Sequence, residues 1–359
     1  MWEPRQPIHA RRADRFRPPH CPWPECEDHT TDFGYRATRK GYYSRLRDRK
    51  RVPRFLCGTC GRTFSRDAFA TTYYLKRPEL LLPIASLLVN GCAHRQIARH
   101  LGCAPSTVTN LSVRLGRHGL LFQRFSAAQV VIDEPVVLDH FETFVRSQQE
   151  RLGIATAVGR RSWFVQALHG AGYLRQGRRS RRKRALKTLP KQPPPGELLV
   201  STLKTLENLL RRCPGGLDLV SDDHPAYRAA IRRLALRSKT PPPIRHIIHA
   251  NPDRSPGHDR EQALQRDWAL FGVDLLHKLL RHSQKHHGRE TIAFGRRRPH
   301  VIGRFALFAV WRNMIKKITE RRPTRFTPAM LVGLTSRPWT WAEVFAERLF
   351  ERRVALRTA

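Results

Sequence analysis

The spacing of apolar residues predicts a pair of helices in the N-terminal half of the chain. Within residues 94–101 the apolar positions fall on one helical face, as in an amphipathic helix. Gly102 follows, and glycine there allows the positive φ of a tight turn. A second helix is expected from Pro105, with Val108 and Leu111 facing inward. Helix, glycine turn and second helix form the pattern of a helix-turn-helix, although a plain helical hairpin shares it.

The second of these helices would carry the DNA contacts. In a helix-turn-helix it enters the major groove by its N-terminal end. Polar side chains there suit hydrogen bonding to base edges and phosphates. The exposed candidates are Ser106, Thr107, Thr109, Asn110 and Arg114.

After about residue 126 the pattern changes to short β-branched runs that alternate with helical segments. The expected elements are strands at 136–139, 154–158 and 163–168, a helix at 196–212, a strand at 217–221, a helix at 225–236, a strand at 244–249 and a helix that includes 267–287. The order β-β-β-α-β-α-β-α is that of an RNase H-like domain, which places carboxylates on the first strand, after the fourth strand and on a late helix.

Four of the seven cysteines fall into two close pairs, Cys21 with Cys26 and Cys57 with Cys60. Tetrahedral Zn²⁺ takes four thiolates at about 2.3 Å, which two short turns from separate hairpins can supply. Residues 61–65 resemble the last strand of a zinc ribbon. We therefore predict one structural zinc, with four unrelated reduced cysteines as the alternative.

Together these patterns predict a multidomain α+β protein. Its expected parts are a basic disordered arm (1–20), a zinc ribbon (21–72), a helical helix-turn-helix unit (73–125), an RNase H-like α/β catalytic domain (126–320) with a basic insert (174–195), and a C-terminal helical extension (321–359). An apolar stripe at helical spacing within 341–349 suits either core packing or a dimer contact.

The net charge of the chain also predicts the kind of partner that it binds. The 359 residues include 67 Lys+Arg and 29 Asp+Glu, a formal net charge of +38. Such a field favours a polyanion, because each neutralised phosphate releases counterions. The basic insert is expected to follow the DNA backbone, with a solvated loop as the alternative. Its central residues are Arg181, Arg182, Lys183 and Arg184.

The sequence also predicts the cellular location of the protein. The N-terminus has no apolar stretch of the kind found in a secretion signal. The longest apolar run, 301–311, is short and interrupted by Arg304. The positive charge is not confined to one amphipathic helix, which disfavours a membrane-surface role. We expect a cytoplasmic, nucleoid-associated protein.

Acidic residues beside apolar strands stand out in so basic a chain. Asp139 ends the first expected strand, Asp222 follows the fourth, and Asp274 lies on the late helix. Three clustered carboxylates cannot all stay ionised without a cation. Two Mg²⁺ ions about 3.5–4 Å apart would stabilise both the attacking and the leaving oxygen at a phosphodiester. Taken singly, each acid is more often a solvated surface group.

Four stretches now resemble one known family. They are the ribbon end at 57–65 followed by the helix-turn-helix, Ser-Asp-Asp-His-Pro-Ala-Tyr at 221–227, Leu-Leu-Arg-His at 279–282, and Arg-Glu-Thr-Ile-Ala-Phe at 289–294. The chain resembles bacterial transposases of the insertion-sequence-one type from residue 21 to about residue 311. The resemblance implies an enzyme that cuts phosphodiesters at element ends and transfers the 3′-hydroxyl to target DNA. It also implies a homodimer or higher oligomer on double-stranded DNA.

The resemblance places Asp274 on the family's third acid, which is usually Glu. The family often shows Asp-Glu at the first acid, and this chain has that pair at 133–134, ahead of Asp139. These departures leave three reserve acids, Asp133, Asp223 and Glu290.

Three basic residues are expected to hold DNA phosphate near the metals. Lys278 and Arg281 share one helical face with Asp274, and Arg289 follows the helix. Arg281 matches the family's helix arginine. The alternative role of the helix pair is an intrahelical ion pair.

Two other functions remain open. The departures at the acids allow a catalytically inactive DNA-binding regulator derived from a transposase. A zinc-ribbon RNA-processing protein would instead need stacking aromatic residues on a sheet face. Only 9% of the residues are aromatic, so we rank this function third.

Overall fold

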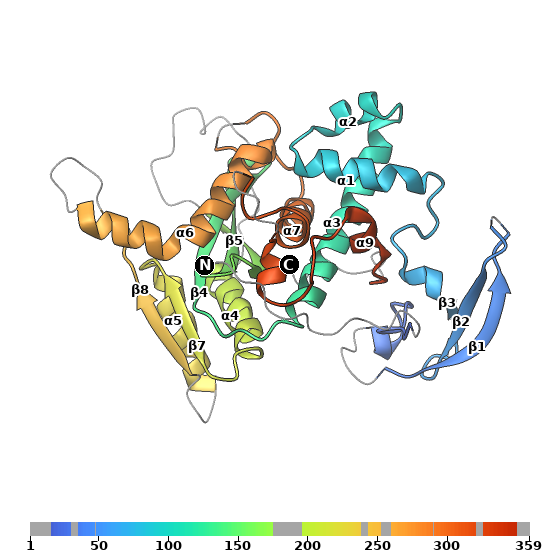
Figure 1. Cartoon of the computed structure of the whole chain (residues 1–359), viewed down its shortest axis with the longest axis horizontal. Helices are drawn as coiled ribbons and strands as arrows, with labels where there is room; N and C mark the ends of the chain where they lie inside the picture. The colour runs from blue at the N-terminus through green and yellow to red at the C-terminus, as the bar shows by residue number, and fades with distance from the viewer. Residues whose placement is uncertain are drawn as a thin grey trace.

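A computed structural model describes residues 16–29, 35–46, 48–174, 196–237, 243–252, 260–289, 291–320 and 326–349. They form a three-stranded sheet, a group of helices and a five-stranded sheet (Figure 1). The expected mixture of α and β structure is therefore confirmed. Several predicted features lie outside these residues: most of the basic arm, the basic insert with Arg181, Arg182, Lys183 and Arg184, Glu290, and the end of the chain from 350.

The three-stranded sheet lies at one end of the molecule (Figure 1, blue). Its antiparallel strands are β1 (Ala37–Ser44), β2 (Arg51–Cys57) and β3 (Thr63–Ser65). A small core of Phe55, Phe64 and Phe69 packs around the buried cysteines. So small a core offers little apolar burial of its own.

Three helices follow, α1 (Leu81–Val89), α2 (His94–His100) and α3 (Pro105–Ala127). Gly102 has φ +57°, so the predicted tight turn between α2 and α3 is confirmed. Pro105 starts α3 at a position where its missing N–H costs no helical hydrogen bond. Two helices joined by a glycine turn, as the spacing predicts, are thus present in the backbone.

Glycines let α3 pack closely against α7 (Arg298–Met314). A Cβ on Gly116 would lie 3.1 Å from the backbone of Gly303, and a Cβ on Gly119 would lie 2.8 Å from the amide nitrogen of Leu307. One apolar core runs through α1, α3, α6 and α7. Packing is therefore continuous across residue 125, where the sequence suggests a boundary between two parts.

The five-stranded sheet has the order β6-β5-β4-β7-β8. Its strands are β4 (Val136–Val145), β5 (Ser147–Gly159), β6 (Val165–Leu174), β7 (Leu217–Ser221) and β8 (Ile244–Ile248). The β4–β5 and β5–β6 pairs are antiparallel, whereas β4–β7 and β7–β8 are parallel. All five predicted strands are present, but β4 and β5 extend well beyond the apolar runs because a long hairpin pairs their polar ends.

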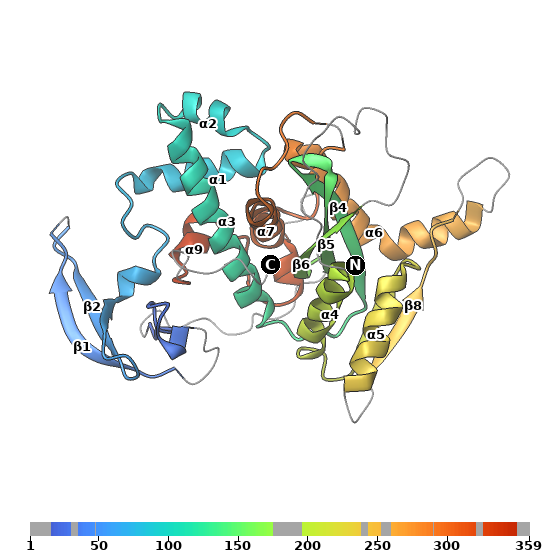
Figure 2. The same ribbon diagram turned by 180° about the vertical axis from the view of Figure 1, so that it is seen from behind.

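Helices cover both faces of this sheet (Figure 2). On one face, α4 (Glu197–Leu210) and α5 (Pro225–Arg237) pack on Val136 and Leu138. On the other face, Val137 and Phe141 pack in the core that contains α6 (Arg260–Ser283) and α7. The alternation of residues along β4 therefore assigns each side chain to one layer.

The C-terminal helices close the same core. They are α8 (Pro328–Leu331) and α9 (Trp341–Ala346), and Trp341 and Val344 are buried. The His118 ring lies 2.8 Å from the Val344 carbonyl oxygen, which ties α9 to α3. The apolar stripe of this region is therefore core packing. Within the described part of the chain, no helix combines the length and apolar composition needed to cross a membrane.

Candidate functional site

The four paired cysteines form one compact cluster. The sulfur atoms of Cys21, Cys26, Cys57 and Cys60 all lie within 4.8 Å of one another. Cys21 Sγ is 3.7 Å from Cys60 Sγ, and Cys26 Sγ is 3.8 Å from Cys57 Sγ. Four sulfurs bound at about 2.3 Å around a tetrahedral ion would stand roughly 3.8 Å apart. The predicted four-cysteine cluster is confirmed, and its geometry is consistent with one zinc ion.

The surroundings of Cys57 lower the pKa of its thiol. Burial by itself raises the pKa of Cys57, but the backbone amides of Cys60 and Thr59 help to outweigh it, and the pKa is lowered to about 7. Metal binding requires the thiolate form. The second cysteine turn thus stabilises the charged sulfur that a metal would bind.

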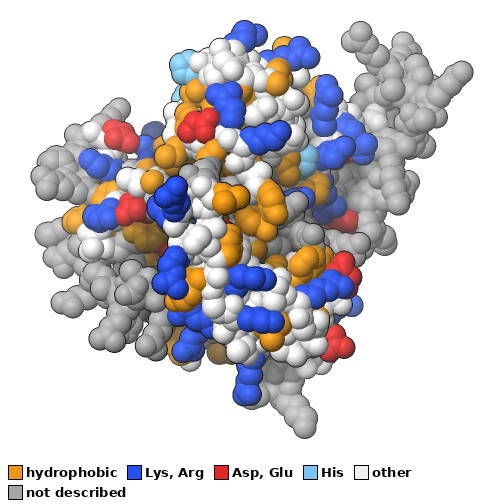
Figure 3. Space-filling view, turned by 90° about the vertical axis from the view of Figure 1, so that its right-hand side faces the viewer, with side chains coloured by type: hydrophobic (Ala, Val, Ile, Leu, Met, Phe, Trp, Pro, Cys, Tyr) orange, Lys and Arg blue, Asp and Glu red, His pale blue; other side chains and the backbone are white. Residues whose placement is uncertain are grey.

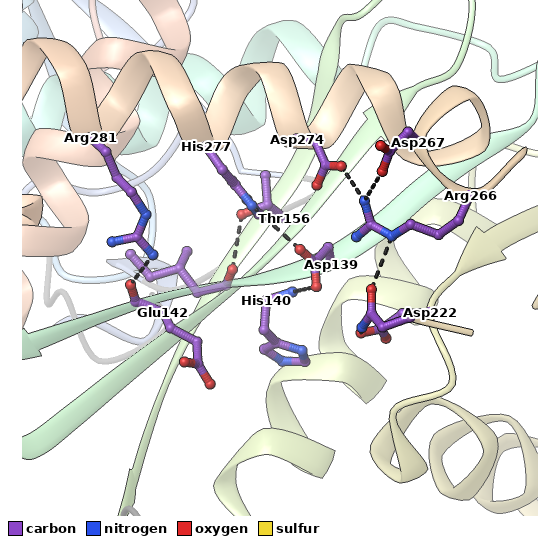
Figure 4. Close-up of polar contacts among 12 residues, drawn as sticks. Asp139, His140, Glu142, Thr156, Asp222, Arg266, Asp267, Asp274, His277 and Arg281 are labelled. Carbon is purple, nitrogen blue, oxygen red and sulfur yellow. Dashed lines mark hydrogen bonds and ion pairs between the residues drawn. The ribbon is translucent and has the colours of Figure 1, made fainter. Parts of the chain in front are cut away.

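Asp139 and Asp222 lie side by side on neighbouring parallel strands. Leu138 of β4 pairs with Ser221 of β7, and each aspartate is the next residue. The apolar pattern predicts Asp139 at the end of its strand; this prediction is wrong, because β4 continues to Val145. Asp139 lies instead beside the end of the partner strand β7. Its side chain faces α6 (Figure 4).

The two carboxylates influence each other electrostatically. Burial and the charge of Asp139 raise the pKa of Asp222 above its usual value. Burial also acts to raise the pKa of Asp139, but His277 and the His140 amide more than offset it, so that pKa is lowered. His277 Nδ1 lies 3.4 Å from one Asp139 oxygen, and the His140 amide donates to the other at 2.8 Å. Asp139 is therefore the more readily ionised member of the pair.

Asp274 is held differently from the other two acids. It lies on α6 and forms an ion pair with Arg266 (Figure 4). The Arg266 Nε also donates to Asn251 Oδ1 at 3.0 Å, and Asn251 Nδ2 donates to Asp222 Oδ2 at 3.0 Å. A chain of polar contacts thus connects Asp274 to Asp222 through a guanidinium and an amide.

The three acids do not form a closed ligand set. Among the described residues, the cysteine cluster is the one group of three or more His, Cys, Asp or Glu side chains whose ligand atoms lie within 4.8 Å. Arg266 supplies positive charge beside Asp274, and His277 lies beside Asp139. The sheet brings Asp139 and Asp222 together, whereas Asp274 remains with its arginine.

Sequence analysis missed Arg266, Asn251 and His277. His277 stands three residues after Asp274, so helical spacing alone could have placed both on one face of α6. Asn251 follows β8 much as Asp222 follows β7. No sequence signal distinguishes Arg266 from the many other arginines.

The reserve acids have other surroundings. Asp133 is exposed before β4, and Asp223 is exposed and paired with Arg228. Glu134, the second half of the Asp-Glu pair, is buried and accepts hydrogen bonds from the Arg161 amide at 2.6 Å and the Ser162 amide at 2.9 Å. Glu134 therefore holds the turn between β5 and β6 and lies outside the acid pair.

Two of the three predicted phosphate-binding residues line one cavity. Lys278 is exposed on α6, and Arg289 is exposed after the helix. Arg281 stacks on the Phe141 ring, 4.7 Å from its centroid, and donates to the Glu142 carbonyl at 2.8 Å. Arg281 and Arg289 line a cavity of about 370 Å³ beyond the acids.

The polar residues predicted for DNA contact occupy the start of α3. Ser106, Thr109 and Asn110 are exposed, and Thr107 is half-buried. Arg114 is not exposed as expected: its guanidinium donates to the carbonyls of Thr71 at 2.8 Å and Tyr73 at 3.0 Å. The difference arises because the segment before α1 packs over this part of α3.

Positive side chains are spread widely over the molecule. Figure 3 shows the face that carries the three-stranded sheet, with many Lys and Arg side chains and few acidic ones. Like charges spread in this way give this face a positive electrostatic field.

No protein-family model matches this chain, and the search of curated proteins found no similar sequence. The distinguishing features of the chain are a closed set of four thiols and two neighbouring carboxylates in a protein of net charge +38.

Proposed function

We propose that this protein is a metal-dependent DNA transposase that cuts phosphodiesters at the ends of a mobile element and transfers the freed 3′-hydroxyl to target DNA. The observation that carries the proposal is the position of Asp139 on β4 beside Asp222, which directly follows the adjacent parallel strand β7. The order β6-β5-β4-β7-β8, with β5 antiparallel to both neighbours, supports an RNase H-like catalytic domain.

The acid pair fits divalent metal chemistry. The raised pKa of Asp222 reflects burial and the neighbouring charge of Asp139, and a bound cation would relieve the repulsion between the two carboxylates. Asp139 and Asp222 would hold Mg²⁺, and Asp274 would join them after leaving Arg266. Bound Mg²⁺ would supply stabilisation for the attacking and leaving oxygens of the phosphodiester.

Other parts of the chain would bind and position the DNA. The exposed polar residues at the start of α3 would contact the major groove, and the surrounding positive charge would hold the backbone. A structural Zn²⁺ in the cysteine cluster would stabilise the ribbon. The protein would act in the bacterial cytoplasm on nucleoid DNA, as a homodimer or higher oligomer that pairs two element ends.

The test is Mg²⁺-dependent cleavage and strand transfer on DNA that carries the flanking element ends. Asp222→Asn is expected to lower both activities by about a thousandfold or more, because it removes a metal-binding charge. Asp218→Asn is the matched control, since Asp218 lies on the same strand β7 and pairs with Arg245. Equal activity of wild type and Asp222→Asn would reject the assignment of the site.

A DNA-binding regulator without catalysis is the second candidate. The ion pair between Asp274 and Arg266 favours it, because a protein cation already neutralises the third acid. A regulator would bind end-containing DNA tightly and in a salt-dependent way. It would show no cleavage with Mg²⁺ or Mn²⁺ in either wild type or Asp222→Asn.

A further inference from the structure

A polar cavity lies at the end of the sheet, away from the acid pair. Its volume is about 370 Å³. Three arginines from separate segments line it: Arg151 of β5, Arg281 of α6 and Arg289, which follows the helix. Tyr173 of β6 and Glu142 of β4 complete the part of the wall that concerns its charge.

The three guanidiniums repel one another across this cavity. Burial and the positive charges of Arg289 and Arg151 lower the pKa of Arg281. Among the described residues of the wall, Glu142 is the single carboxylate, so three positive groups there face one negative group. Like charges brought together in this way are stabilised by an anion that sits between them.

Arg151 also has an unsatisfied hydrogen-bond donor. Its Nε is buried and has no hydrogen-bond partner among the described residues. Buried donors without a partner are rare in folded proteins and point to a ligand or an ordered water. Arg281 has fewer donors to spare, because its two terminal nitrogens donate to the carbonyls of His287 and Glu142.

We propose that this arginine pocket, formed by Arg151, Arg281 and Arg289, binds a phosphate group of the DNA strand on which the acids act. Phosphate oxygens accept paired hydrogen bonds from guanidinium groups and satisfy several donors at once. The inference rests on the proposed function for the identity of the strand, while the anion chemistry rests on the pocket itself.

The arginine pocket lies about 10 Å from the acids, both along β4 and along α6. Glu142 is three residues beyond Asp139 on β4, which corresponds to about 10 Å along a strand. Arg281 is seven residues beyond Asp274 on α6, which also corresponds to about 10 Å along a helix. The arginine pocket therefore lies close enough to the acids to hold a nearby phosphate of the strand bound at Asp139 and Asp222.

The experiment measures DNA affinity of the full chain against salt concentration, without Mg²⁺, so that catalysis plays no part. Arg151→Gln is expected to weaken binding about eightfold near 0.1 M salt and to reduce the slope of log K against log salt by about 0.9, the loss of one phosphate contact. Arg146→Gln is the matched control, because Arg146 lies on the same hairpin but is exposed and paired with Glu150. Its affinity is expected to stay within about twofold of wild type.

A second variant protects this test against misfolding. Arg289 is exposed, so Arg289→Gln removes a charge from the arginine pocket without disturbing packing. The same loss of slope is expected for Arg289→Gln. Unchanged slopes in both pocket variants, or an equal loss in Arg146→Gln, would overturn the proposal.

Binding of inorganic phosphate distinguishes the two possible ligands of the arginine pocket, a phosphate of DNA and free phosphate. If phosphate alone binds wild type but not Arg151→Gln, while both bind DNA equally, the ligand is free phosphate and the DNA assignment is rejected. Weaker DNA binding by Arg151→Gln, in a protein whose wild type never cleaves DNA, would uphold the arginine pocket and reject the transposase. Cleavage by wild type, together with unchanged DNA binding in Arg151→Gln, would uphold the transposase and reject the arginine pocket.

Discussion

The four cysteines and the three aspartates are both sets of possible metal ligands, but the protein holds them in different ways. The cysteine sulfurs lie within 4.8 Å of one another, around a small core of three phenylalanines. The aspartates lie on a sheet and a helix that large cores support on both faces, and Asp274 already has a cation partner in Arg266. We therefore expect the ribbon to need a bound metal ion in order to fold, whereas the sheet should fold without one.

The largest expected effect comes from removing a cysteine ligand. Cys57→Ser should abolish zinc binding and unfold the ribbon, because structural zinc sites contribute about 10 kcal/mol or more to folding. The five-stranded sheet should remain folded. Zinc content, together with limited proteolysis of the ribbon and the body, measures both effects.

Cys103→Ser is the control for that variant, since Cys103 lies outside the cluster and is half-buried. It should retain one zinc per chain. Full zinc content in Cys57→Ser would show that Cys57 is not a required ligand of the metal.

The same contrast explains what could be predicted from the sequence. The cysteine turns, Gly102 and the strand at 217–221 depend on local residues, and the structure has each where the pattern placed it. The closeness of Asp139 and Asp222 depends on strand pairing across about eighty residues, so it could be expected only from a whole order of elements.

Long-range polar contacts lay beyond such patterns. Arg266 reaches Asp274 along its own helix and Asn251 beyond β8, and nothing local marks it among the arginines. Arg114 looked like a DNA contact because its helix face is polar, yet the segment at 71–73 covers it. Tertiary packing, which apolar spacing does not specify, decided both cases.

A substitution in the helical core should affect the body and leave the ribbon alone. Gly119→Ala should lower the free energy of unfolding by about 1–3 kcal/mol, because its Cβ would lie 2.8 Å from the Leu307 amide nitrogen. Helix propensity alone would give the opposite sign. Urea unfolding followed by circular dichroism measures the change, and zinc content should not move.

Gly215→Ala is its control, because a Cβ there meets no atom within 4 Å. Its stability should match wild type within about 0.5 kcal/mol. A stabilised Gly119→Ala would mean that α3 and α7 are further apart than described here.

Glu134 is an acid with a structural role, in contrast to the acids that we propose for catalysis. Glu134→Ala should lower the free energy of unfolding by about 1–3 kcal/mol, because the buried amides of Arg161 and Ser162 lose their acceptor. Any Mg²⁺-dependent activity of the folded variant should stay near that of wild type. The exposed neighbour serves as the control, with Asp133→Asn expected to change neither quantity; loss of activity there would restore Asp133 as a catalytic acid.

The smallest expected effect concerns the cation that stands beside the third acid. Arg266→Gln should strengthen Mg²⁺ binding about tenfold, roughly 1.4 kcal/mol, because Asp274 no longer has to leave a guanidinium before it binds metal. Titration calorimetry with Mg²⁺ measures the change, with Arg260→Gln as the control, since Arg260 is exposed at the start of the same helix. An unchanged or weaker Mg²⁺ affinity would show that Arg266 positions Asp274 and does not compete with metal, and the difference between the two ligand sets would then lie in their cores alone.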